Sequence, residues 1–192
     1  MSNCWGIYLP MKSETVTKIQ SAIIGNAGEH LAISYLLRKN LIAGLAPQNT
    51  EDFDVVVMSR TGQTLFPVQV KASTKKNWML SNKHERPIKS LIYIFIRFSK
   101  DLMNSEMYIL DSEKVAQVTK TSHAIWLKLP SSNGAPHKST KIRNLIIDHS
   151  ALTRKITSPE KYLAPHELHF IQTHSADWLE PYRDNWNLFK KK

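Results

Sequence analysis

An aspartate, a glutamine and a lysine on two neighbouring apolar segments could perform metal-assisted chemistry on a phosphate. Asp54 precedes a run of three valines, and Gln69 and Lys71 lie in a second apolar run that ends at Ser73. Side chains alternate between the two faces of a strand, so Gln69 and Lys71 point to the same face. If the two segments pair as a hairpin, Asp54 joins them on that surface. Oxygen ligands beside a cation at one sheet edge suit a hard divalent metal and a phosphate group.

Each of these residues also has an ordinary structural interpretation. A carboxylate in an apolar strand costs free energy unless it is paired or binds a metal, but Asp54 could also cap a turn or face water. Gln69 and Lys71 could belong to the solvated face of an alternating strand. Glu29 lies beside the apolar stripe of a preceding helix and could be aimed at the same surface, or it could be an ordinary boundary glutamate.

The elements that must position these residues can be read from hydrophobic spacing and turn residues. A helix should begin near Ser13 and end near Asn40 or Gly44, and glycine within it costs about 1 kcal/mol per residue. Close approach to another backbone is therefore the expected reason for Gly25 and Gly28. We expect strands at Phe53–Met58, Leu65–Ser73, Leu91–Phe98 and Met107–Leu110, a polar loop at Lys75–Pro87, and a helix over 112–121 capped by Asp111. The region 145–147 is either strand or helix.

This order predicts an α/β fold of the mixed α+β type, with a central mixed sheet of four to five strands flanked by helices. Residues 1–12 are expected to form an irregular arm, and residues 13–192 a single domain with a core over about 20–112. An aromatic, helical extension is expected over about 141–192. Its apolar stripe consists of Trp178, Tyr182, Trp186 and Phe189, which we expect to pack on the core.

The composition favours a polyanionic partner. The chain has 192 residues and a formal net charge of +10 at pH 7, which favours nucleic acid first and an anionic membrane surface second. A single cysteine, Cys4, excludes an internal disulfide framework and a Cys-based zinc site. No apolar run approaches the roughly 20 residues that span a bilayer. We expect a soluble cytoplasmic protein without a membrane partner.

A basic segment follows the second strand and indicates where nucleic acid could bind. Phosphate contacts from lysine and arginine dominate affinity for nucleic acid, and an interleaved tryptophan can stack on a base. The alternative is a solvated lysine loop with the tryptophan ring folded back on the sheet. The residues concerned are Lys75, Lys76, Trp78, Lys83, Arg86 and Lys89.

The whole pattern resembles the PD-(D/E)XK nuclease superfamily over roughly residues 20–112. It is most similar to Mrr-like restriction endonucleases, which carry a glutamine before the x-Lys, and more distantly to archaeal Holliday junction resolvases. The resemblance implies a restriction endonuclease-like core and phosphodiester hydrolysis that depends on Mg2+ or Mn2+. The implied catalytic residues are Glu29, Asp54, Gln69 and Lys71, and the implied metal ligands are Asp54, Gln69, the Val70 carbonyl and Glu29. Many nucleases of this fold cut both strands as dimers, which makes a homodimer one expected arrangement.

The chain departs from the family pattern at two positions. Phe53 stands where the family has proline, which affects only the turn, and Gln69 stands where the family usually has glutamate. A site with two carboxylates holds a metal less tightly than a site with three. The function expected is a metal-dependent nuclease acting on DNA. Two alternatives stay open: a nucleic-acid-binding protein that kept the fold and lost the chemistry, and a structural or partner-binding domain.

Overall fold

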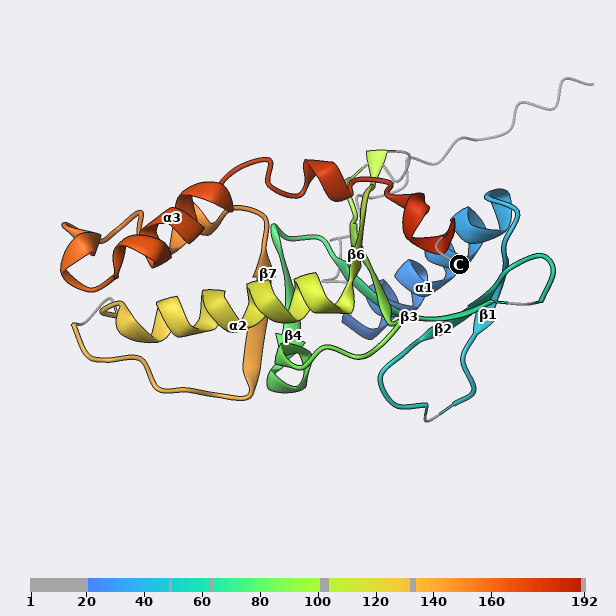
Figure 1. Cartoon of the computed structure of the whole chain (residues 1–192), viewed down its shortest axis with the longest axis horizontal. Helices are drawn as coiled ribbons and strands as arrows, with labels where there is room; N and C mark the ends of the chain where they lie inside the picture. Colours follow the sequence, from blue (N-terminus) through green and yellow to red (C-terminus); the bar gives the residue numbers. More distant parts are fainter. Residues whose placement is uncertain (1–20, 49, 63, 101–103, 132–133, 191–192) are drawn as a thin grey trace, which may run out of the picture.

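The fold is built around a five-stranded sheet whose strand order is β1-β2-β3-β5-β6. The structure is a computed structural model that describes residues 21–48, 50–62, 64–100, 104–131 and 134–190 (Figure 1). The strands of the sheet are β1 (Ile42–Leu45), β2 (Val55–Met58), β3 (Leu65–Ser73), β5 (Ile92–Arg97) and β6 (Glu106–Asp111). A separate two-stranded ribbon consists of β4 (Asn77–Ser81) and β7 (Ile142–Ile146).

The sheet is mixed, as the sequence predicted. Strand β2 is antiparallel to both β1 and β3, β3 and β5 are parallel, and β5 and β6 are antiparallel. The helices are α1 (Ser21–Arg38), α2 (Ser112–Lys128) and α3 (Pro165–Thr173). Shorter 3-10 turns are η1 (Asn82–Glu85), η3 (His149–Leu152), η4 (Pro159–Lys161), η5 (Glu180–Tyr182) and η6 (Trp186–Lys190). The expected class, a four- to five-stranded mixed sheet flanked by helices, is confirmed.

Helix α1 covers one face of the sheet and packs closely on β3. Ala32 and Leu36 are fully buried in a cluster with Val68 of β3. A Cβ built on Gly28 would lie 2.5 Å from the Cβ of Ala72, so the helix can approach the strand this closely only with glycine there. The expected close approach is therefore confirmed at Gly28. At Gly25, an added Cβ would meet no atom of the described residues within 4 Å, so the same expectation is wrong there.

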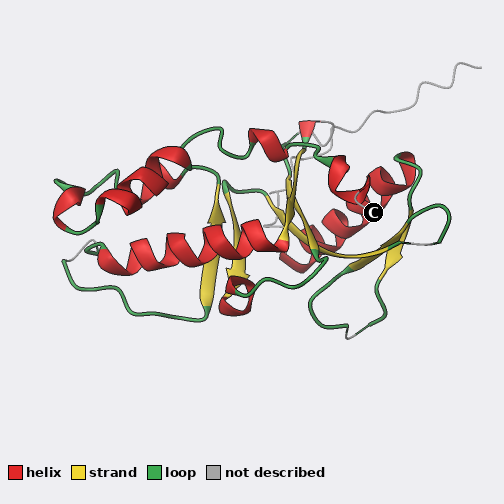
Figure 2. Cartoon of the chain, in the orientation of Figure 1, coloured by secondary structure: helices red, strands yellow, loops and turns green. Residues whose placement is uncertain are grey.

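Helix α2 and the β4–β7 ribbon cover the opposite face. Trp78 of β4 and Val115 of α2 belong to one buried cluster with Phe95 of β5. Figure 2 shows α2, in red, crossing the two strands of the ribbon, in yellow. Asp111 caps α2 as expected, since its carboxylate accepts a hydrogen bond of 2.8 Å from the main-chain N–H of Lys114.

Several predicted boundaries were wrong. The expected loop at Lys75–Pro87 contains β4 and η1, because β4 pairs with β7, which is remote in the sequence. Strand β1 was not predicted, and α2 extends to Lys128 rather than 121. The region 145–147 contributes to a strand, β7.

The C-terminal aromatic residues pack on the core but do not share one helix. The segment is divided between η5 and η6, and Asp184 between them has a positive φ of 48°. Trp178 packs on the α2 side, whereas Phe189 packs edge-on against Phe66 on the α1 side. Residues 1–12, the helix start near Ser13 and the cysteine lie outside the described residues. In the part of the chain that the structure describes, no helix has the length and apolarity needed to cross a membrane.

Candidate active site

The β2–β3 hairpin brings Asp54 beside Gln69. The strands are antiparallel with Val55 opposite Val68, and the main-chain N–H of Asp54 donates to the Val68 carbonyl at 2.8 Å. Oδ2 of Asp54 accepts hydrogen bonds from the Gln69 amide nitrogen and from the main-chain N–H of Val70, the latter at 2.8 Å. The carboxylate is therefore held at the point where β2 begins, against the middle of β3.

Lys71 lies on the same face of β3 as Gln69, as strand alternation requires. The neighbouring Val70 and Ala72 point to the other face, where they lie within 4 Å of the Cβ position of Gly28. Burial lowers the pKa of Lys71, the charge of Asp54 raises it, and the charge of Lys83 lowers it further. Lys71 is thus a partly desolvated cation, and Asp54 is the charged group with the largest effect on it.

Glu29 belongs to α1, which packs on the face of β3 opposite to Gln69 and Lys71. Glu29 follows Gly28, the residue that lets the helix touch β3, and its side chain is half-buried. Burial raises the pKa of Glu29, the negative charge of Asp54 raises it further, and the positive charge of Lys71 lowers it. Of the four residues that the sequence singled out, the structure joins Asp54 and Gln69 by a direct hydrogen bond. It brings the charges of Glu29 and Lys71 within electrostatic range of Asp54.

Two further side chains adjoin the site and were missed from the sequence. Tyr93 of β5 is the register partner of Gln69. Burial raises the pKa of Tyr93, and the negative charges of Asp52 and Asp54 add to this effect. His84 of η1 packs against the Tyr93 ring at 5.9 Å between centroids. Tyr93 was missed because it lies within an apolar run. Its hydroxyl could have indicated the site, since that end of the side chain needs a polar neighbour.

The buried imidazole of His84 is held by the main chain of Ser81. Its Nδ1 lies 3.1 Å from the Ser81 nitrogen and 3.0 Å from the Ser81 carbonyl oxygen, so it accepts from the first or donates to the second according to the tautomer. Nε2 is buried and has no partner among the described residues. Burial lowers the pKa of His84, the hydrogen bond to Ser81 opposes this, and the charges of Lys71 and Lys83 lower it further. A neutral imidazole therefore lines the site beside the two lysines.

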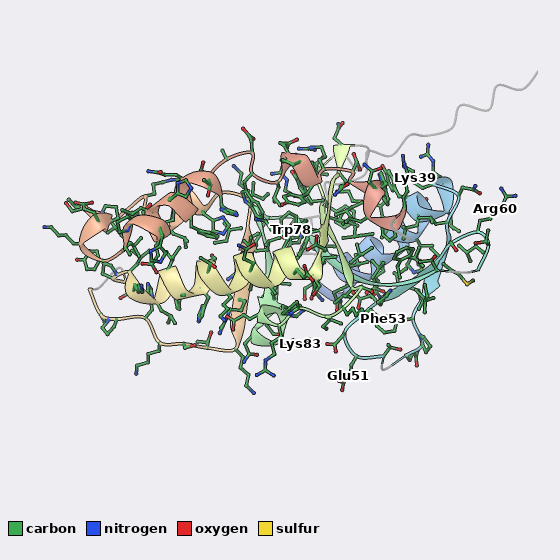
Figure 3. All side chains as sticks on the ribbon, viewed as in Figure 1. Lys39, Glu51, Phe53, Arg60, Trp78 and Lys83 are labelled. Carbon is green, nitrogen blue, oxygen red and sulfur yellow. The ribbon has the colours of Figure 1, made fainter. Side chains whose placement is uncertain are left out.

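The six residues expected to bind nucleic acid divide into five basic side chains and one tryptophan. Five of them are exposed: Lys75, Lys76, Lys83, Arg86 and Lys89. Lys83 pairs with Asp52 at 2.8 Å and lies near the segment that carries Phe53 and Glu51 (Figure 3). Trp78 is different, because its side chain is 1% exposed and its indole N–H donates to the Ile96 carbonyl at 2.8 Å. The expectation that Trp78 stacks on a base is therefore wrong, and the alternative, a ring folded back on the sheet, is what the structure has.

The oxygen atoms at this site fit a divalent cation of the Mg2+ type. Oδ1 of Asp54 is not engaged by the two donors that bind Oδ2. The N–H of Val70 points at Asp54, and the carbonyl of a strand residue lies on the same side of the strand as its N–H. Gln69 presents its amide nitrogen to Asp54, and a rotation of the amide by half a turn would present the oxygen instead.

The negative charge of the site comes from two carboxylates. Among the described residues, no three His, Cys, Asp or Glu side chains are grouped so that they could hold a metal ion. Glu29 and Asp54 therefore need neutral oxygen ligands, from Gln69 and Val70, to complete a metal shell. Mg2+ keeps several water ligands in such sites, so this donor set is sufficient in number.

Comparisons with known proteins gave a structural likeness but no family. No family model matches the chain, and no curated protein matches it. Among solved structures, the chain is similar to the bacterial homing endonuclease I-Ssp6803I, with a TM-score of 0.41 and 10% sequence identity over 89% of this chain and 92% of that chain. The interpretation of the site therefore rests on the geometry of the chain's own residues.

Proposed function

We propose that this chain is a metal-dependent endonuclease that hydrolyses phosphodiester bonds, with DNA as the favoured substrate. The observation that carries the proposal is the hydrogen bond between Gln69 and Asp54, together with the electrostatic effects that Asp54, Lys71 and Glu29 exert on one another. An acid from a helix, an acid from one strand and a Gln-x-Lys pair from the next are the side chains that metal-assisted phosphate chemistry requires.

The proposed roles follow from charge and position. A bound Mg2+ or Mn2+ supplies an activated water and stabilises negative charge on the phosphate. Asp54, Gln69 and the Val70 carbonyl hold the cation, and Glu29 holds a water or a second ion. Lys71 orients the attacking water or the scissile phosphate through its positive charge. Burial and the charge of Lys83 lower the pKa of Lys71, and this direction also fits a role as proton acceptor, which is the alternative to the electrostatic role.

The exposed lysines and Arg86 support a nucleic-acid partner. Together with the net charge of +10, they provide phosphate contacts around the site. DNA rather than RNA, and a homodimer that carries two such sites, are parts of the proposal that follow from the family resemblance.

A second candidate function is a nucleic-acid-binding protein without catalysis. The specific observation in its favour is the hydrogen bond from the Gln69 amide nitrogen to Asp54, which satisfies the carboxylate without a metal. In an active enzyme, the Gln69 amide would have to turn so that its oxygen could serve as a metal ligand.

One pair of measurements on the unmodified protein separates the two candidates. Calorimetric titration with Mg2+, then with Mn2+, should give saturable heat if the site is a metal centre. Incubation with supercoiled plasmid and with single-stranded DNA should give products in the presence of either ion and none in EDTA. Salt-sensitive DNA binding without metal heat or cleavage would instead establish the binding-only function.

A further inference from the structure

The β4–β7 ribbon has one buried face and one solvent face. Its strands are antiparallel, with Met79 opposite Asn144 and Ser81 opposite Ile142. Trp78, Leu80 and Leu145 are at most 4% exposed and pack under α2 and against β5. Because side chains alternate, the residues between them lie on the other face of the ribbon, where Ile142, Asn144 and Ile146 also line a hollow beside α2.

The solvent face is apolar in its exposed centre and polar beside it. Met79 is 69% exposed and Ile142 is 53% exposed, and the two lie diagonally across the ribbon. The amide of Asn77 donates to the side-chain oxygen of Asn144 at 3.0 Å across the ribbon. This bond leaves the oxygen of Asn77 and the amide hydrogens of Asn144 available to another partner. The face consists of Asn77, Met79, Ser81, Ile142, Asn144 and Ile146, and none of them is acidic.

Positive charge borders this face at both ends. Exposed Lys75 and Lys76 precede β4, and exposed Lys141 precedes β7. At the Ser81 end, the Lys141 carbonyl accepts a hydrogen bond of 2.9 Å from the N–H of Asn82, the first residue of η1. The next residue, Lys83, lies close enough to Lys71 to lower its pKa. The Ser81 end of the ribbon therefore lies beside the candidate active site.

We propose that the solvent face of the β4–β7 ribbon enters the major groove of duplex DNA and reads base edges there. The major groove admits a two-stranded β-ribbon, and an asparagine amide is complementary to the edge of adenine. Asn77 and Asn144 supply the amides, and Met79 and Ile142 contact thymine methyl groups. The flanking lysines bind the phosphates on either side of the groove. The choice of nucleic acid as partner rests on the proposed function, but the ribbon's role in binding does not depend on catalysis.

Binding measured in EDTA tests this role separately from hydrolysis. The probe is a labelled random-sequence DNA duplex, from which bound sequences are selected and then used in anisotropy titrations. Met79→Glu places a negative charge in the groove and should weaken binding at least about tenfold. The double change Asn77→Ala with Asn144→Ala should reduce the preference for the selected sequence at least about fivefold. Leu65→Glu is the matched control, because Leu65 is 61% exposed on β3 and lies outside the ribbon.

Each outcome decides the ribbon's role. Loss of affinity in Met79→Glu but not in Leu65→Glu, with unchanged thermal stability, supports it even if the protein cleaves nothing. Unchanged affinity in Met79→Glu overturns it even if the protein is a nuclease. No enriched sequence from the selection, or no binding of duplex at low salt, also overturns it. A dimer that dissociates in Met79→Glu while DNA affinity is unchanged would assign the face to a second copy of the chain instead.

Discussion

Replacing Gly28 with alanine perturbs the contact that places Glu29 beside the sheet. The new Cβ would lie 2.5 Å from the Cβ of Ala72, far inside the separation of about 3.5–4.0 Å at which carbon atoms pack. Both atoms are attached directly to backbone, so no rotamer change relieves the clash and α1 must move away from β3. Such overpacking typically costs about 1–3 kcal/mol.

Gly25→Ala is the matched control in the same helix. Its added Cβ meets nothing within 4 Å. Both substitutions gain about 1 kcal/mol from the higher helix propensity of alanine. The difference in free energy of unfolding between the two variants therefore isolates the clash, and we expect Gly28→Ala to be less stable than Gly25→Ala by about 1–3 kcal/mol.

The assay is thermal or urea unfolding of the two variants beside the parent protein. For a chain of this length, a difference of 1 kcal/mol corresponds to about 2–4 °C in Tm. Since Glu29 moves with the helix, Gly28→Ala should also reduce any metal-dependent cleavage, and a displacement of about 1 Å can cost on the order of 100-fold. Equal stabilities of the two variants would refute the close packing of α1 on β3.

Three further predictions concern the scaffold. Trp78→Ala should destabilise the fold by about 3–5 kcal/mol in urea unfolding, because the ring is buried rather than available to DNA; a change below about 1 kcal/mol would contradict its burial. Burial lowers the pKa of His149 to about 4, below the pKa of ~6.5 that histidine has in an unfolded chain. The neutral ring therefore stabilises the fold fully above pH ~6.5, and this stability is lost as the pH falls towards 4. Between pH ~6.5 and 4, the free energy of unfolding of the parent should fall by roughly 3 kcal/mol relative to that of His149→Phe. Parallel pH profiles of stability for the two proteins would contradict this prediction. Asp111→Ala should cost about 1 kcal/mol through loss of the helix cap, whereas Glu113→Ala on the same exposed turn should not.

The central hairpin could be predicted because its signals are local. Strand β3 has the predicted bounds, and alternation alone placed Gln69 and Lys71 on one face. The short turn between β2 and β3 fixes their pairing, with Ser59 donating to Thr64 at 2.9 Å and Gly62 at a φ of 74°. Asp54 then has to lie beside Gln69. Strong period-two patterning and a tight turn therefore determined this part of the site.

The parts that could not be predicted depend on contacts between distant segments. Strand β4 is short and lies in a basic segment, and only its pairing with β7 makes it a strand. This pairing also turns Trp78 inwards against Phe95, a contact that residue types near Trp78 do not reveal. Tyr93 and His84 joined the site because β5 is parallel to β3 and η1 follows β4. Tertiary packing overrode the local signal at each of these positions.

The most direct test of the proposed active site is the rate of DNA cleavage with saturating Mg2+ in variants of its two charged strand residues. Asp54→Asn keeps the shape of the side chain and removes its charge, and Lys71→Met removes the cation while keeping most of the chain length. We expect each variant to cleave plasmid DNA at least about 100-fold more slowly than the parent, because each removes an electrostatic contact to the reacting phosphate or its metal. The exposed α2 variants Glu113→Ala and Lys120→Ala should cleave at the parental rate. Cleavage by Asp54→Asn and Lys71→Met at the parental rate would contradict the assignment.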